Sequence, residues 1–376
     1  MTARARAFLI GALVAVTMFY GCAKEEEEPP PAGTSAAAPE LPDVPYVYEL
    51  PTLPDHFNSI LLNIWESTPD DNPITDAGAT LGRVLFYDRS LSTNNSINCG
   101  SCHKQEAGFA DPQAFSLGHL GGSTHRNAMH LVNQFYVRAQ FWDVRAPSLE
   151  AQVLMPIQDA VEMGMSLDEV TQRLRSLDYY APLFQWAFGD DSITSDRISR
   201  ALAQFVRSMA SYRTPYDEGF ADDFAQLTQL ERDGKALFFN GQTKCNHCHM
   251  TVNFFNRDAR NNGLDVVYAD NGLGVVTGDP ADNGKFKVPS LRNVELTAPY
   301  MHDGRFNTLE EVVEHYNSGV QQHPNLDDRL TVDGHTGGTP LQLGLTEYDK
   351  QALIAFMKAL TDTPMITDVR FSDPFR

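Results

Sequence analysis

Two short segments of the chain combine two cysteines and a histidine at the same spacing: Cys-Gly-Ser-Cys-His at residues 99–103 and Cys-Asn-His-Cys-His at residues 245–249. Apart from Cys22, they contain every cysteine of the protein. This spacing is the attachment signature of c-type haem, in which two thiols bind one porphyrin and the histidine becomes an axial ligand of the iron. A zinc site would need four clustered ligands. The sequence therefore predicts two covalently bound c-type haems, held by Cys99, Cys102 and His103 and by Cys245, Cys248 and His249.

The N-terminus predicts export. Arg4 and Arg6 precede an apolar run at residues 8–19, so we interpret residues 1–22 as a signal peptide. Its Gly-Cys end resembles a bacterial lipoprotein cleavage site, with Cys22 acylated and anchoring the protein to a membrane; the alternative is simple cleavage and release into the periplasm. Residues 23–54 are rich in Glu, Pro and Ala and predict a disordered tether. Because c-type haem is attached outside the cytoplasm, the periplasmic address agrees with the haem motifs.

The charge of the chain limits its partners. A formal net charge of −20 disfavours binding to nucleic acid. Such a surface can steer a basic electron-carrier protein towards the molecule, or it can simply keep an exported protein in solution.

The elements around the two haem motifs repeat. Residues 82–88 and 234–240 share a Gly-x-x-Leu-Phe pattern and predict the end of a helix before each motif. Residues 201–206 and 352–357 match further downstream, with apolar residues at helical spacing and Ser195 and Thr346 as N-caps. A helix before the motif packed against one well after it is the plan of a c-type cytochrome.

The predicted fold is therefore mainly α, with two cytochrome c-like helical domains, each around one covalently bound haem, and long loops. At 376 residues the chain is long enough for two cores. We place the first domain at residues 55–212 and the second at residues 213–362. We expect residues 261–284 to form a loop with a short hairpin, and the tail at residues 363–376 to pack over the body or to fray.

Several motifs in order resemble the bacterial di-haem cytochrome c peroxidases and the related MauG enzyme of methylamine utilisation, over about residues 76–362. They lie at residues 81–92, 99–103, 141–143, 162–164, 291–294 and 299–304. The resemblance implies that the first haem reacts with peroxide and the second collects electrons. It implies a distal acid–base role for Glu162, a neighbouring role for Gln152, an electron relay between the haems for Trp142, and a cofactor contact for Arg292. Peroxide cleavage needs a base that takes and returns a proton, and burial brings the pKa of a carboxyl towards neutrality.

The resemblance also implies one calcium ion between the domains, held by Asn127, Thr297 and Pro299. Oxygen ligands with few charges suit calcium better than a transition metal.

Two positions imply different enzymes. His119 follows the first motif at the spacing of a displaceable iron ligand in the peroxidases, although it is also typical of an exposed histidine in a Gly-rich loop. Tyr316 stands where the peroxidases supply methionine to the second haem and the MauG group supplies tyrosine. Methionine raises the reduction potential, whereas a phenolate favours higher oxidation states. Met301 is the main competitor for this iron, and further possibilities are His302, His315 and His323.

The function that these observations favour is a di-haem peroxidase that reduces hydrogen peroxide to water. Electrons would come from a small donor, a cytochrome c or a cupredoxin, through the second haem and Trp142. One alternative is a MauG-like enzyme that uses peroxide to oxidise a Tyr or Trp of a partner protein. Another is a non-catalytic electron carrier. The resemblance also makes a homodimer possible.

Overall fold

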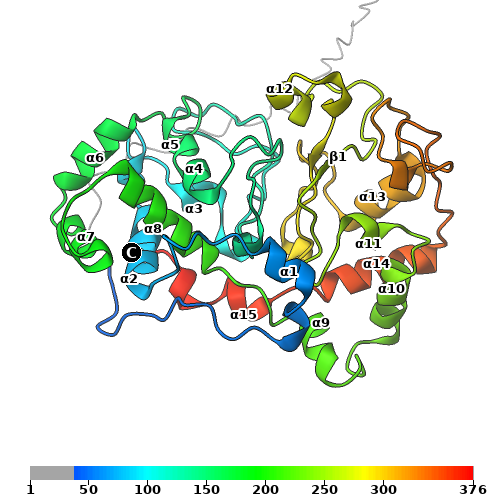
Figure 1. Cartoon of the computed structure of the whole chain (residues 1–376), viewed down its shortest axis with the longest axis horizontal. Coiled ribbons are helices and arrows are strands. Elements are labelled where there is room, and N and C mark those ends of the chain that lie inside the picture. Colours follow the sequence, from blue (N-terminus) through cyan, green and yellow to red (C-terminus); the bar gives the residue numbers. More distant parts are fainter. Residues whose placement is uncertain (1–37, 376) are drawn as a thin grey trace, which may run out of the picture.

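The computed structural model describes residues 38–375. The fold is mainly helical, as predicted, and consists of two halves side by side, joined by long loops (Figure 1). The helices are α1 (Ile60–Trp65), α2 (Asp76–Tyr87), α3 (Cys99–Cys102), α4 (Leu149–Val153), α5 (Met155–Gln158), α6 (Leu167–Arg175), α7 (Tyr180–Phe188), α8 (Ser195–Arg207), α9 (Pro215–Glu218), α10 (Gln229–Phe239), α11 (Cys245–Cys248), α12 (Leu273–Thr277), α13 (Leu309–Glu314), α14 (Glu347–Lys358) and α15 (Thr363–Ile366). Two short strands, β1 (Ala259–Arg260) and β2 (Phe286–Lys287), pair antiparallel.

Each half is built on one pair of packed helices, α2 with α8 and α10 with α14. At both helix crossings a glycine lies against a backbone carbonyl of the partner helix. Gly82 lies against the Ala201 carbonyl, and Gly234 lies against the Ala352 carbonyl, so that a Cβ at either glycine would overlap backbone atoms. The absence of a side chain therefore lets the two helices of each pair approach closely. The predicted repeat is confirmed, because both halves contain the same helix pair with a glycine at the crossing.

Of the two predicted N-caps, Thr346 is confirmed and Ser195 is wrong by one position. Thr346 caps α14, because its side chain accepts from the N–H of Asp349. The cap of α8 is Thr194 and not Ser195. Thr194 has the extended backbone that an N-cap needs and accepts from the N–H of Arg197, whereas Ser195 is already the first helical residue.

The repeat extends beyond the helices that the sequence analysis detected. The backbone N–H of Asn133 donates to Met209 O (2.9 Å), and that of Asn293 donates to Leu360 O (2.9 Å). A β-bridge between Gln140 and Ala146 has its counterpart in a bridge between Tyr300 and Phe306.

The two halves also exchange equivalent contacts across their boundary. The N–H of Asn127 in the first half donates to His302 O in the second (2.8 Å), and the N–H of Lys287 in the second donates to Trp142 O in the first (2.7 Å). Asn127 and Lys287 are therefore equivalent positions, as are Trp142 and His302. The boundary has an approximate two-fold relation.

The tail packs on the first half rather than on the second. Met365 and Phe371 are buried in the core of the first half, and the hydroxyl of Tyr87 donates to Phe371 O (2.6 Å). Figure 1 shows the C-terminal end beside α2. The end of the chain thus completes the first domain.

The predicted disordered tether does not extend to residue 54. Tyr48 is 2 % exposed; its N–H donates to Asp76 (2.6 Å) and its hydroxyl to Arg370 O (2.9 Å). From residue 38 the chain therefore lies on the body. The rest of the tether, the signal peptide and Cys22 lie outside the described residues.

The stretch at residues 261–284 is more ordered than the predicted loop, because it contains α12 and is bracketed by β1 and β2. Within residues 38–375, no helix has the length and apolar character needed to cross a membrane.

Candidate functional site

The second Cys-x-x-Cys-His motif orients its histidine for metal binding. Cys245 and Cys248 lie on α11, and His249 ends that helix. Nδ1 of His249 donates to the carbonyls of Phe254 (3.0 Å) and Pro289 (3.2 Å). Because Nδ1 carries the proton, Nε2 presents its lone pair. Burial lowers the pKa of His249 and so favours the neutral imidazole, the form that binds a metal.

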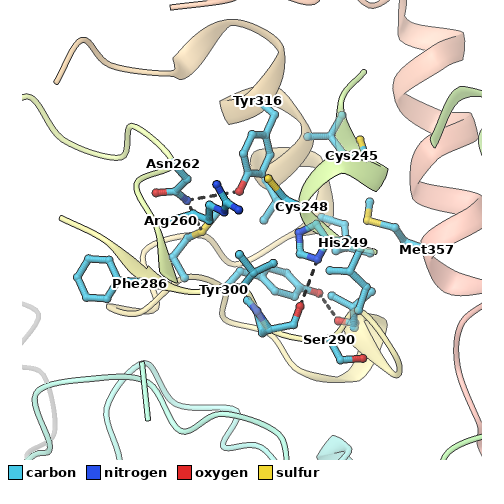
Figure 2. Close-up of a pocket in the computed structure, with 18 of the residues that line it drawn as sticks. Cys245, Cys248, His249, Arg260, Asn262, Phe286, Ser290, Tyr300, Tyr316 and Met357 are labelled. Carbon is cyan, nitrogen blue, oxygen red and sulfur yellow. Dashed lines mark hydrogen bonds between the residues drawn. The ribbon is translucent and has the colours of Figure 1, made fainter. Parts of the chain in front are cut away.

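A large apolar cavity opens in front of this motif (Figure 2). Cys245, Cys248 and His249 line it together with Trp142 from the first half. The apolar lining includes Phe238, Leu291, Val294, Leu309, Val313, Leu353 and Met357. Two thiols, an imidazole and an apolar wall suit a covalently attached porphyrin, so these residues fit a c-type haem.

Tyr316 reaches the same cavity from a different element, the π-helical turn His315–Gly319 after α13 (Figure 2). Such turns are rare and often mark functional positions. The side-chain amide of Asn262 donates to the Tyr316 hydroxyl (3.4 Å) and lies 3.5 Å from the Met301 sulfur. Burial raises the pKa of Tyr316, so a phenolate here would need a neighbouring cation. Tyr316 and Met301 both line the cavity, and ligation by Tyr316 stays a prediction.

The other candidate ligands of this iron make contacts with other residues, and His302 also lines the cavity. Nε2 of His315 donates to Asn262 O (3.1 Å). The ring of His302 stacks on Phe286 with centroids 3.8 Å apart. Nδ1 of His323 accepts from the N–H of Asn325 (3.0 Å).

The first motif has the same local design as the second. Cys99 and Cys102 lie on α3, and Nδ1 of the following His103 donates to Phe109 O (2.9 Å), as His249 does to Phe254. The motif is fixed by a capping box in which Asn98 accepts from the N–H of Ser101 (2.9 Å) and Ser101 accepts from that of Asn98 (3.0 Å). His103 therefore also presents Nε2, as the predicted axial role requires.

Glu162 has the electrostatics of an acid–base group. Burial raises its pKa to about 7, with a further upward contribution from Asp159 and an opposing one from Arg145. Burial raises the pKa of Cys99 to about 12 and that of Cys102 to about 11, and the Glu162 carboxyl adds to both shifts. The carboxyl therefore lies within electrostatic reach of the first haem-attachment thiols.

His119 is not the exposed loop histidine that one of our alternatives described, because it is only 6 % exposed. Its backbone N–H (2.9 Å) and its Nδ1 (3.1 Å) both donate to the carbonyl of Glu162. A Cβ at Gly164 would lie 2.5 Å from the ring, so the missing side chain there leaves room for the imidazole. His119 is thus clamped to the Glu162 segment, and its Nε2 has no hydrogen-bond partner within residues 38–375, although ligation of iron stays a prediction.

The remaining predicted site residues lie in two places. Gln152 is half-buried on α4. The indole N–H of Trp142 donates to Asn127 O (2.9 Å), which fixes the ring at the boundary between the halves. Asn127, Thr297 and Pro299 line the same large cavity as Trp142, and their joint binding of calcium stays a prediction.

Arg292 has a different environment from the one expected. It is fully buried, and its guanidinium makes two hydrogen bonds to Asp217 (both 2.8 Å) and others to Val252 O. Arg292 is absent from the cavity lining formed by the described residues. Its guanidinium therefore holds α9 and the loop after α11 together, and the predicted haem contact stays a prediction.

Two similar half-molecules, each presenting two cysteines and a histidine whose Nδ1 is held by a backbone carbonyl, define a di-haem c-type protein. The chain belongs to the di-haem cytochrome c peroxidase family, whose family model, "Di-haem cytochrome c peroxidase", matches residues 76–224. It is 35 % identical to the methylamine utilization protein MauG of Methylorubrum extorquens over 301 residues, which cover 79 % of this chain and 81 % of the relative.

Two further comparisons agree. The chain is 36 % identical to the cytochrome c551 peroxidase of Nitrosomonas europaea over 240 residues, covering 63 % of this chain and 71 % of the relative. A crystal structure described as a MauG-like protein associated with microbial copper homeostasis superposes with a TM-score of 0.74 at 36 % identity, covering 82 % of this chain and 96 % of the other.

Proposed function

We propose that the protein is an exported di-haem peroxidase that reduces hydrogen peroxide to water at the first haem site, with electrons from a small donor protein such as a cytochrome c or a cupredoxin. The observation that supports this most strongly is Glu162, a half-buried carboxyl whose pKa is raised to about 7 and which lies within electrostatic reach of the first haem-attachment thiols. The haems, when bound, supply the iron that reacts with peroxide and passes electrons.

Glu162 acts as the acid–base group in this proposal. In its ionised form it takes the proton from the near oxygen of peroxide, and it then returns that proton to the far oxygen, which leaves as water. Gln152 offers an amide that hydrogen-bonds the peroxide and holds it for this transfer. Trp142 carries electrons between the two haem sites, because its indole is fixed at the boundary of the halves.

Calcium at the boundary of the halves belongs to the same proposal. The Asn127 amide nitrogen donates to Gln113 O (3.1 Å), which leaves the amide oxygen available to bind a cation. The carbonyl oxygens of Thr297 and Pro299 complete the protein ligands. We expect a calcium chelator to slow turnover and added Ca²⁺ to restore it, and Asn127→Leu to abolish the restoration. Turnover that is indifferent to the chelator would contradict the calcium site.

A MauG-like activity, the oxidation of a Tyr or Trp of a partner protein, is the second candidate. Tyr316 favours it, because a tyrosine rather than a methionine reaches the second cavity from the π-helical turn.

A peroxide titration of the haem-loaded protein, in ferric and in reduced form, tests both functions. A peroxidase consumes peroxide in many turnovers while it oxidises a reduced donor. A MauG-like enzyme turns over slowly with the donor and instead accumulates oxidising equivalents that a protein substrate discharges. If neither iron reacts with peroxide in any redox state, the protein is an electron carrier and both proposals fail.

A further inference from the structure

A buried lysine faces the second haem cavity with its charge uncompensated. Lys287 is 6 % exposed and lines the cavity from β2. In the described part of the chain its ammonium makes no hydrogen bond or ion pair, and burial alone lowers its pKa to about 7. An ammonium taken out of water without a partner is strongly disfavoured, so this position calls for an anion.

The other cations near this cavity already have protein partners or water. The Arg260 guanidinium pairs with Asp327 (2.9 Å) and Asp258 (2.8 Å), and its Nε has no hydrogen-bond partner among the described residues. Lys244 is only half-buried and can remain hydrated. Within residues 38–375 no carboxylate forms an ion pair with Lys287, so an anion held in the cavity would compensate its charge.

The backbone around Lys287 belongs to the second haem site. Two residues further on, the Pro289 carbonyl accepts from Nδ1 of His249 (3.2 Å). The N–H of Lys287 donates to Trp142 O (2.7 Å), which fixes the strand against the boundary of the halves. The backbone that carries Lys287 is thus anchored close to His249, and its ammonium lies within electrostatic reach of His130, which lines the same cavity.

The structural equivalence of the two halves also favours a positive charge at Lys287. Lys287 stands at the position equivalent to Asn127, because each donates its N–H across the boundary to an equivalent carbonyl, that of Trp142 or His302. Asn127 is our proposed calcium ligand. The two equivalent positions would therefore both bring a positive charge to the boundary, one through a bound ion and one through a side chain.

We propose that the Lys287 ammonium forms an ion pair with a propionate of the haem attached at Cys245 and Cys248. This inference rests on the di-haem function proposed above. Propionates are the anionic groups of a c-type haem, while the rest of its edge is apolar, so they are the partners that such a cavity can offer to an ammonium. A positive charge close to the porphyrin stabilises the ferrous state, which carries one charge fewer than the ferric state. Lys287 would thus position the haem through its propionate and raise the reduction potential of this haem.

The test compares Lys287→Met and Lys287→Arg by spectroelectrochemistry of the haem-loaded protein. We expect the methionine variant to shift the ferric/ferrous equilibrium of the second haem about tenfold towards ferric, which is about 59 mV for one electron. The arginine variant, which keeps the charge, should stay close to wild type. Lys285→Met is the matched control, since Lys285 lies two residues away, half-buried, and pairs with Asp282 (3.0 Å). An unchanged potential in Lys287→Met, or an equal shift in Lys285→Met, overturns the inference.

A second readout covers the case in which Lys287→Met does not load haem. The resonance Raman band for propionate bending should shift between wild type and Lys287→Arg, because a planar guanidinium binds a carboxylate in a different geometry from an ammonium. An unshifted band overturns the ion pair. Failure of the proposed function is distinguishable, since it would show as a wild-type protein with fewer than two haems or without any reaction with peroxide.

Discussion

The protonation of Glu162 sets a specific pH profile for the reaction with peroxide. The group must be ionised to take a proton, and its pKa is about 7 because of burial. About 10 % of the molecules are ionised at pH 6 and about 90 % at pH 8, so the second-order rate constant with peroxide should rise about tenfold between these values and then level off. Stopped-flow mixing of the haem-loaded protein with peroxide measures it directly. Glu162→Gln should lower the plateau by about 100-fold or more and remove the step.

Substitutions of Asp159 and Arg145, which shift the pKa of Glu162, test whether this carboxyl causes the rise of the rate with pH. Asp159 raises the pKa of Glu162, so Asp159→Asn should move the midpoint to lower pH. The substitution keeps an acceptor oxygen for the N–H groups of Val161 and Glu162 that Asp159 holds (2.8 and 3.1 Å). Arg145 lowers the pKa, so Arg145→Met should move the midpoint to higher pH. A midpoint that stays fixed in both variants, or a Glu162→Gln protein with wild-type rates, would refute the role of this carboxyl.

Three further outcomes follow from other parts of the molecule. Tyr316→Met should raise the reduction potential of the second haem in a redox titration, because methionine favours ferrous iron, and an unshifted potential would count against ligation. Gly82→Ala should lower the free energy of unfolding by about 1–3 kcal/mol in chemical denaturation, since its Cβ would meet the α8 backbone, whereas Gly122→Ala, with only an ordinary contact at 3.6 Å, should not. Asp217→Asn should destabilise the protein by about 3–5 kcal/mol, because it leaves the buried Arg292 without its charge partner; a stability equal to wild type would show that the pair is dispensable.

The features that could be predicted from the sequence are those whose cause is local. Covalent haem attachment needs two thiols and a histidine at fixed spacing, so the motifs identified both sites directly. The helix pairs could be predicted because the crossing glycines, Gly82 and Gly234, sit in the same Leu-Phe context. The cap of α8 was missed by one position, since Thr194 and Ser195 are both good caps and only the backbone conformation distinguishes them.

The features that escaped prediction depend on contacts between residues far apart in the chain. Nothing near Arg292 in the sequence indicates that Asp217 neutralises it. The burial of His119 depends on the carbonyl of Glu162 and on the missing side chain of Gly164, both more than forty residues away. Lys287 looks like any polar residue of a short strand until the cavity around it is known.

The approximate two-fold relation explains how one structural plan can give two different haem sites. In both halves a backbone carbonyl accepts from Nδ1 of the haem-motif histidine, His103 or His249. In both halves an N–H group, that of Asn127 or Lys287, also donates across the boundary. The two irons would therefore be supported alike. The halves differ in elements outside that plan, such as α12 and the π-helical turn of the second half, and in side chains at its edges. At equivalent boundary positions, one half has Trp142 and the other His302. Near its haem thiols the first half has Glu162, a half-buried carboxyl whose pKa is raised to about 7, while the second presents a phenol, Tyr316, from a π-helical turn. A substitution that exchanges such edge residues should therefore alter the reactivity or the potential of one haem and leave the shared scaffold intact, whereas a substitution at a crossing glycine should destabilise the scaffold without changing the chemistry of either site.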